Sequence, residues 1–170
     1  GDILIFLDSD VFFENEDWLT GTREVLSRCD ITQPFSKAVW LDQDGVPEKS
    51  RLPVCSALAE GKTPKLNEYH PGFGWAMTRE AFEKIGGFYD RAVSGSGDAA
   101  ISFALATDEM LAPMMNWWKQ NDRFINVPTY VAYRKKVLSL GLRVGAHGGA
   151  TAFHRWHGTT GGRRYVDRDA

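Results

Sequence analysis

The chain opens with a continuous apolar run, Ile-Leu-Ile-Phe-Leu at residues 3–7. A strand covered on both faces has this pattern, whereas a strand with one wet face alternates apolar and polar residues. The run therefore predicts a central strand of a parallel α/β sheet. Such a strand needs neighbours and crossover helices. Because nothing here precedes it, we expect the natural N-terminal part of the domain to be missing.

Capping residues and apolar periodicity predict several helices after this strand. Ser, Thr, Asn and Asp favour helix starts, and Gly favours the position after the last turn. Pro is favoured in the first turn. The expected helices, with their caps, are 16–28 (Asn15), 79–85 (Thr78, then Gly86 and Gly87), 98–106, 114–120, and 128–140 (Pro128, then Gly141).

Short apolar stretches between these helices predict further strands at 31–35, 39–41, 73–77, 142–145 and 150–153. Gln43-Asp44-Gly45 is typical of a hairpin turn after the second of them. We expect an irregular loop at 53–64, and no internal repeat or second domain. The fold class predicted is α/β, in one domain over 1–170.

Composition places the chain among ordinary globular proteins, with 43% hydrophobic and 25% charged residues. The formal net charge of −2 provides no excess of positive charge for binding nucleic acid or an anionic membrane. No apolar run is long enough for a membrane-spanning helix. Cys29 and Cys55 have no metal-like spacing, so we expect two free thiols in a reducing, cytoplasmic compartment.

Two acidic residues, Asp8 and Asp10, follow the first strand. Ligands in open α/β sheets bind beyond the carboxyl ends of the strands. In extended backbone residues i and i+2 point the same way, and paired carboxylates attract a cation. Oxygen ligands suit Mg²⁺ or Mn²⁺. The alternative interpretation is a solvated turn.

A second cluster, His154-Arg155-Trp156-His157-Gly158, follows the last predicted strand. Either imidazole could complete a metal site with the aspartates. Beyond it, Arg163, Arg164 and Tyr165 offer two cations and a ring for a diphosphate. The alternative is a surface loop with one core histidine. For His70 and His147 we expect no direct role.

Two Gly-rich segments complete the candidate site. Gly97-Asp98 opens a helix, so Asp98 is either a helix cap or a general base. In the segment 70–75, Gly72 and Gly74 would let a ligand approach the backbone, and Trp75 could stack on a sugar ring. The alternative for this segment is core packing.

The order of these motifs resembles that of a known family: an apolar strand then LDSD, GFGWAMTREAFEKIGGFYDRAVSGSGDAAISFAL, and FHRWHG followed by RRY. It is similar to the GT-A fold glycosyltransferases, specifically the family 2-like bacterial and phage enzymes, with a galactosyltransferase-like C-terminal module. The similarity covers roughly 3–14, 70–106 and 150–165. It implies the Rossmann-like GT-A fold, of which this chain would be the C-terminal, metal- and acceptor-binding portion without most of the nucleoside pocket.

The resemblance also implies residue roles. Asp10 would bind Mn²⁺ or Mg²⁺, and Asp8 would contact the metal or the donor ribose. His157, or else His154, would complete the metal shell. Asp98 would deprotonate the acceptor. The family's acidic motif usually has two adjacent acids, whereas here Gly97 and Ala99 flank a single one. The implied sugar- and acceptor-binding residues are Gly72, Gly74, Trp75, Gly97 and Trp156, and the implied diphosphate-binding residues are Asp8, Arg163, Arg164 and Tyr165.

The implied activity is metal-dependent transfer of a sugar from a nucleotide-diphosphate-sugar, such as a UDP-sugar, to a hydroxyl acceptor, such as a glycan. A single base without a second nucleophilic carboxylate favours inversion. Three alternatives stay open: a nucleotidyltransferase, a non-catalytic carbohydrate-binding module using Trp75 and Trp156, and a two-carboxylate glycoside hydrolase.

Overall fold

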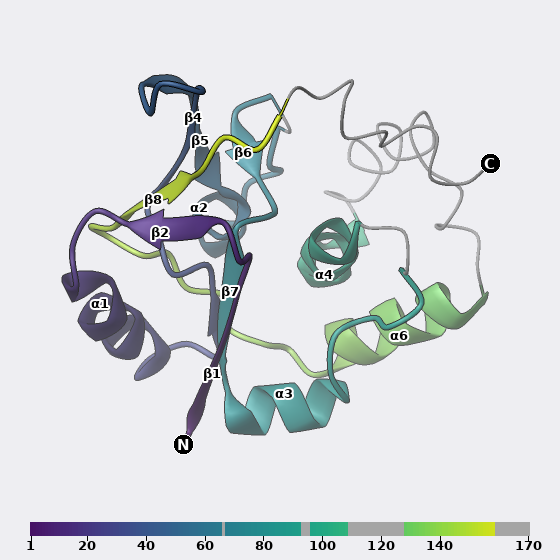
Figure 1. Cartoon of the computed structure of the whole chain (residues 1–170). Helices are drawn as coiled ribbons and strands as arrows, with labels where there is room; N and C mark the ends of the chain where they lie inside the picture. Colours follow the sequence, from purple (N-terminus) through teal and green to yellow (C-terminus); the bar gives the residue numbers. More distant parts are fainter. Residues whose placement is uncertain (66, 93–95, 109–127, 159–170) are drawn as a thin grey trace.

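The computed structural model describes residues 1–65, 67–92, 96–108 and 128–158, and these form two sheets with helices around them (Figure 1). The predicted α/β class is confirmed at this level. No helix in the described ranges is long and apolar enough to cross a membrane. The expected helix at 114–120 lies outside the described residues.

The first sheet has the order β1-β7-β3, with both neighbours antiparallel to the central strand. Its strands are β1 (Ile3–Leu7), β7 (Gly74–Thr78) and β3 (Ile31–Thr32). The prediction that 3–7 is a central parallel strand is therefore wrong for the part of the chain described here. The expected burial on both faces is wrong as well, since Phe6 and Leu7 are 38% and 41% exposed. One side of Phe6 packs on Phe82 and Phe88, with ring centroids 5.4 and 4.8 Å away.

The second sheet has the order β2-β8-β4-β5-β6. Its strands are β2 (Val11–Phe13), β8 (Thr151–His154), β4 (Lys37–Leu41), β5 (Pro47–Pro53) and β6 (Tyr69–His70). The hairpin predicted at Gln43-Asp44-Gly45 is confirmed, since β4 and β5 pair antiparallel around a turn in which Gly45 has φ +79°. The β4–β8 and β5–β6 pairs are parallel.

The described helices are α1 (Asp17–Leu26), α2 (Val54–Ala59), α3 (Arg79–Ile85), α4 (Gly97–Leu105) and α6 (Pro128–Ser139). Two predicted caps are confirmed: the Thr78 Oγ1 accepts the Ala81 N–H at 3.1 Å, and Gly86 ends α3 with φ +84°. Asn15 Oδ1 accepts the Asp17 N–H at 3.1 Å.

Three predicted elements need correction. The loop expected at 53–64 contains α2, whose Val54 and Cys55 are fully buried and so stabilise a helix without obvious caps. The strand expected at 31–35 is only β3. The strand expected at 142–145 is a single bridge between Val144 and Ile31.

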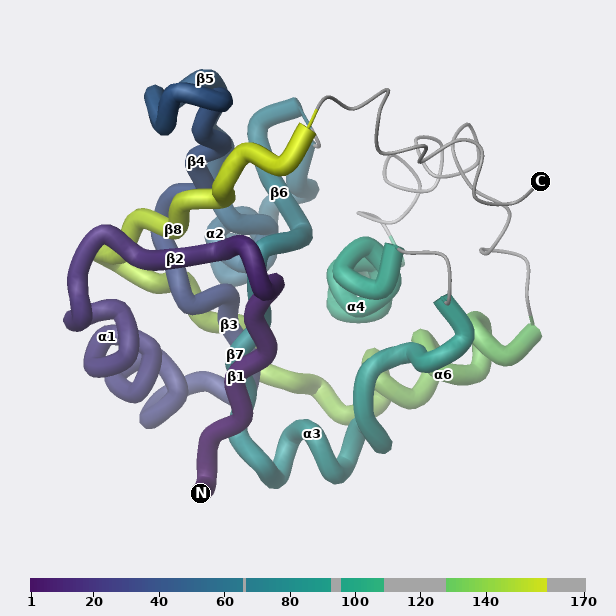
Figure 2. Tube along the Cα trace, in the orientation of Figure 1, coloured from purple at the N-terminus to yellow at the C-terminus, as the bar shows by residue number. Residues whose placement is uncertain are grey.

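The two sides of β7 are covered by different helices (Figures 1 and 2), with α1 on one side and α4 and α6 on the other. The main core cluster lies between β7 and these last two helices and includes Trp75, Met77, Ile101 and Val137.

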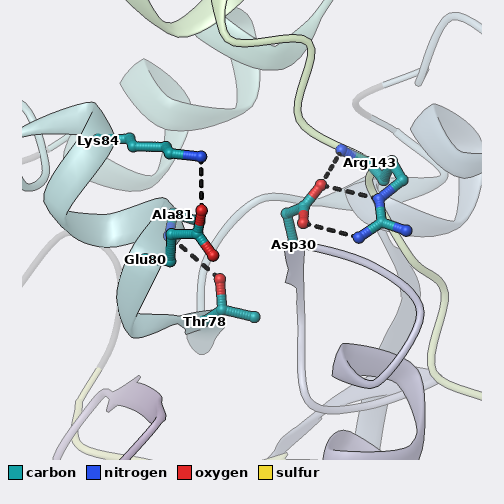
Figure 3. A network of polar contacts seen from close by, with 6 residues as sticks. All are labelled: Asp30, Thr78, Glu80, Ala81, Lys84 and Arg143. Atoms are coloured by element: carbon teal, nitrogen blue, oxygen red, sulfur yellow. Dashed lines mark hydrogen bonds and ion pairs between the residues drawn. The ribbon is translucent and has the colours of Figure 1, made fainter.

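Asp30, immediately before β3, is tied to Arg143 by three hydrogen bonds (Figure 3). The Asp30 carboxylate accepts the Arg143 backbone N–H at 2.7 Å and two guanidinium N–H groups at 3.1 and 3.0 Å. These bonds lower the pKa of Asp30. The contact links the start of β3 to the segment that leads toward β8, and so helps to place the site residues on that strand.

Candidate metal centre

The pairing of β2 with β8 brings the two ends of the sequence motif together. Val11 is the register partner of His154, and the Arg155 N–H donates to the Asp10 carbonyl at 3.0 Å. Asp10 therefore lies beside the end of β8, where the chain leaves the strand toward His157. The predicted proximity of a carboxylate near the start of the sequence to imidazoles near its end is observed.

Three ligand atoms come together at this point. The His157 Nε2 lies 2.8 Å and the His154 Nε2 3.3 Å from the Asp10 Oδ2, and the two nitrogens are 3.3 Å apart. Two donors at right angles around an ion bound at about 2.1 Å are about 3.0 Å apart. The three spacings are therefore compatible with one face of an octahedral shell. This group is a candidate divalent metal site.

The two imidazoles differ in their surroundings. His154 is 8% exposed, and its ring stacks on Phe73 with centroids 5.2 Å apart and planes inclined by 16°. The His157 side chain is 41% exposed. The His154 imidazole is thus held by the core, and the His157 imidazole lies on the solvent side of the group. The sequence left open which histidine takes part, and the structure brings both together.

Asp8 has a different partner from Asp10. Residues 8–11 form a turn closed by the Val11 N–H and the Asp8 carbonyl at 3.2 Å, so the extended backbone expected here is wrong. The Asp8 Oδ2 accepts the Phe73 N–H at 3.2 Å. Partial burial raises the pKa of Asp8, and the charge of the nearby Asp10 raises it further, while the hydrogen bond from the Phe73 N–H lowers it. Asp8 is therefore a neighbour of the three-residue group rather than a member of it.

Asp98 lies in the first turn of α4 and faces the same region. Ser96, the residue that precedes this helix, has a left-handed backbone with φ +65°. Burial raises the pKa of Asp98 to about 7, and the Asp8 charge adds to the shift while the Trp75 N–H opposes it. A carboxyl group with a pKa near neutrality is suited to proton transfer. The electrostatic coupling with Asp8 connects this group to the metal centre.

The segment 70–73 separates Asp98 from the metal centre. On the side of the three-residue group, the Phe73 backbone binds Asp8 and its ring covers His154. On the side of Asp98, a Cβ placed on Gly72 would lie 3.4 Å from the Asp98 Oδ2. The buried Gln33 holds the segment: its side-chain Nε2 donates to the carbonyls of residues 70, 71 and 72, each at 3.1 Å. The Gln33 Oε1 accepts the Cys55 N–H at 3.2 Å. One side-chain amide thus holds the backbone of this segment in place.

The remaining predicted residues are placed as follows. A side chain on Gly74 would collide with Leu7, which explains this glycine by strand packing. Trp75 is 2% exposed and donates its indole N–H to the Pro71 carbonyl at 3.0 Å, so its ring lies in the core. Trp156 is 45% exposed, and a side chain on Gly97 would meet open space. Arg163, Arg164 and Tyr165 lie outside the described residues.

Sequence reasoning did not find Gln33 or Phe73. A polar residue between Thr32 and Pro34 carries no motif, and its role depends on a contact with residues 37 or more positions away. Phe73 has φ +75°, an unusual conformation for a residue with a side chain. The two glycines beside Phe73 were the available signal of an unusual backbone. Cys29 and Cys55 are both free, as expected.

A hollow of about 520 Å³ lies elsewhere, between α1 and residues 146–150. His147 closes one end of it: its Nε2 faces the Trp18 carbonyl at 3.2 Å and its Nδ1 accepts the Gly149 N–H at 3.3 Å. Both ring nitrogens are used, which agrees with the structural role expected for this histidine.

Comparison of the chain with protein-family models, with curated proteins and with solved structures gave no match. Functional inference therefore starts from the chemistry of Asp10, His154, His157 and Asp98.

Proposed function

We propose that the chain is the metal- and acceptor-binding portion of a glycosyltransferase. It would move a sugar from a nucleotide-diphosphate-sugar to a hydroxyl acceptor with inversion at the anomeric carbon. The observation that carries the proposal is the group formed by Asp10, His154 and His157, with a proton-transferring carboxyl group, Asp98, across one short segment from it. The order of the sequence motifs supports the same activity.

The donor set favours Mn²⁺ over Mg²⁺. Mg²⁺ is bound mainly through carboxylates, phosphates and water, whereas imidazole suits the later first-row metals. Two imidazoles and one carboxylate suit an ion that accepts both kinds of ligand. A divalent ion held by these residues would supply Lewis-acid stabilisation of the negative charge that develops on the leaving diphosphate.

Asp98 acts as the general base in this proposal. Its carboxylate takes the proton of the acceptor hydroxyl while the acceptor oxygen attacks the anomeric carbon. Because burial raises the pKa of Asp98 to about 7, the active carboxylate form increases as the pH rises through neutrality. We therefore expect turnover under saturating metal to rise with pH across this range.

One observation favours a second candidate, a glycoside hydrolase. The Asp8 charge raises the pKa of Asp98, so a second carboxylate lies within electrostatic reach of the base. Paired carboxylates with separated pKa values are the machinery of glycosidases. The Phe73 N–H already occupies one Asp8 oxygen, which weakens this candidate.

The test is donor turnover by the full-length protein across a panel of nucleotide-sugars, measured as release of nucleoside diphosphate with Mn²⁺ and with chelator. We expect Mn²⁺-dependent release with at least one donor, and a loss of about 10²-fold or more in Asp98→Asn. Metal-independent cleavage of nitrophenyl glycosides, with no release from any nucleotide-sugar, would replace the transferase by the hydrolase.

A further inference from the structure

The second sheet has a row of side chains that runs across β2, β8, β4 and β5. Phe12 is the register partner of Phe153, Phe153 is the partner of Val39, and Val39 is the partner of Ser50. Successive residues of a strand point to opposite faces of a sheet. The row therefore lies on the face opposite His154, the residue that follows Phe153. We call this the outer face, and it is separate from the metal centre.

A hollow of about 360 Å³ lies on the outer face. Its lining residues belong to β8, β4 and β5, apart from Glu14 just after β2, and none of the described helices contributes to it. Binding pockets for small molecules have volumes of about 300–1,000 Å³. The hollow is at the lower end of this range, so its size suits one ring of a ligand rather than a large molecule.

The floor of the hollow is apolar. It contains the ring of Phe153 and the side chain of Val39, which is 4% exposed. Phe12 holds the Phe153 ring from the side, with centroids 5.4 Å apart and planes inclined by 20°. An aromatic ring has a negative face that attracts the weakly positive hydrogens of C–H groups. The floor therefore suits a flat ligand with a C–H face.

The rim of the hollow is polar. Glu14, Lys37 and Glu48 contribute charged groups, and Ser50 and Thr151 contribute hydroxyls. The three charged side chains are exposed, and in the described part of the chain none of them forms an ion pair. Carboxylates accept hydrogen bonds and an ammonium group donates them, and bonds to charged groups are the stronger ones. The rim can therefore bind a ligand that both donates and accepts.

The balance of charge selects among ligands. Lys49 also lines the hollow, but its ammonium group lies over the Trp40 ring, 4.9 Å from the centroid, on the face that bears His154. Two carboxylates and one ammonium group remain at the rim, which disfavours a phosphate or another anion. Lys and Glu are depleted in protein interfaces, which disfavours a second copy of the chain. A neutral molecule with several hydroxyls fits best.

We propose that this hollow is a non-catalytic sugar-binding site for one neutral pyranose ring of a glycan. The C–H face of the ring lies over Phe153 and Val39, and its hydroxyls bind Glu14, Lys37 and Glu48. The site makes and breaks no covalent bond. It lies on the other side of β8 from the metal centre, so it binds sugar whether or not the chain transfers one.

The experiment measures oligosaccharide binding to the full-length protein in chelator, by calorimetry and by backbone amide shifts in NMR spectra. The neutral probes are maltohexaose, cellohexaose, mannohexaose and chitohexaose, and the anionic probe is hexagalacturonate. The variants are Phe153→Leu, which removes the aromatic ring, and Glu48→Gln, an exposed change that leaves the fold unaffected if the first variant does not fold. Phe6→Leu is the matched control, because Phe6 is also partly exposed, at 38%, but belongs to the other sheet.

We expect at least one neutral probe to bind with a Kd of about 1 mM, with amide shifts centred on Ser50, Thr151 and Phe153. Phe153→Leu and Glu48→Gln should each weaken this binding by about 5-fold or more, and Phe6→Leu should match wild type. Absence of binding, shifts centred elsewhere, or unchanged affinity in both variants would overturn the site. Tighter binding of hexagalacturonate would overturn the neutral ligand. A dimer in sedimentation that Phe153→Leu dissociates would show that a second copy covers this face instead.

Discussion

Asp8 and Phe73 bind each other twice across the β1–β7 boundary. The Asp8 N–H donates to the Phe73 carbonyl at 3.1 Å, and the Phe73 N–H donates to the Asp8 Oδ2 at 3.2 Å. Phe73 itself has a left-handed backbone, with φ +75°. The same residue then stacks on His154. An unusual backbone conformation thus connects the acidic turn with the metal centre.

The positive φ predicts that glycine at position 73 gives a more stable protein than alanine, the reverse of the usual order of these two residues. Both Phe73→Ala and Phe73→Gly lose the ring, but glycine adopts positive φ freely, whereas alanine pays about 1–2 kcal/mol there. We expect the Gly variant to have the higher free energy of unfolding, by about 1 kcal/mol. Urea unfolding of the two variants measures this. An Ala variant as stable as the Gly variant would contradict the positive φ.

Gln33 should be among the most sensitive polar positions in the chain. Gln33→Leu removes the side-chain partner of the His70 and Gly72 carbonyls and of the Cys55 N–H. The Pro71 carbonyl still accepts the Trp75 indole N–H. Each buried group left unpaired costs about 1–3 kcal/mol. We expect a loss of about 3 kcal/mol or more in the free energy of unfolding. The exposed Gln43 of the hairpin turn is the control, and Gln43→Leu should stay within about 0.5 kcal/mol of wild type. Similar losses at both positions would contradict the account.

Asp98 should make stability fall as the pH rises. Between about pH 4 and 7 the folded state keeps a proton that the unfolded chain has released, because the pKa is about 7 in the fold against 3.8 in the unfolded chain. Asp98→Asn cannot ionise, so its stability relative to wild type should increase from pH 4.5 to pH 8. The upper limit is about 4 kcal/mol at about 1.4 kcal/mol per pKa unit, and solvent at the partly buried group reduces it. Urea unfolding in chelator at both pH values tests this, and a constant difference would contradict the raised pKa.

Local signals were reliable where neighbouring residues decide the structure. The Thr78 cap, the Gly86 stop and the Gly45 turn depend on residues within a few positions, and all three were predicted. The direction, neighbours and burial of β1 were not predicted, because an apolar run does not show what packs against it. In the described part of the chain β1 lies at the edge of its sheet, and Phe6 and Leu7 are exposed. Phe82 and Phe88 of the α3 region cover one side of Phe6.

The residues of the candidate site also fall into those that could be predicted from local sequence and those that could not. Asp10, His154, His157 and Asp98 carry chemistry that is visible from residue type and from position after a strand. Gln33 does not, since its importance depends on long-range contacts with the carbonyls of residues 70–72. Trp75 seemed suited to stacking on a sugar, but its side chain lies in the core.

Gly21 of α1 should tolerate alanine poorly, although Gly→Ala within a helix ordinarily adds about 1 kcal/mol of stability. A Cβ on Gly21 would lie 2.6 Å from the His147 Nε2. We expect Gly21→Ala to lose about 1–3 kcal/mol through overpacking. Gly148→Ala, whose Cβ would meet open space, is the control. In a His147→Ala background the penalty at position 21 should disappear, and a penalty that persists would show that His147 is not its cause.

Titration with Mn²⁺ by calorimetry tests the central claim most directly. Wild-type protein should bind one ion, and Asp10→Ala and His154→Ala should each weaken this binding by about 100-fold or more, since each removes one of three protein ligands. Asp44→Ala, in the exposed turn between β4 and β5, should bind as wild type does. Absence of binding to the wild type, or equal affinity in wild type and Asp10→Ala, would contradict the metal centre.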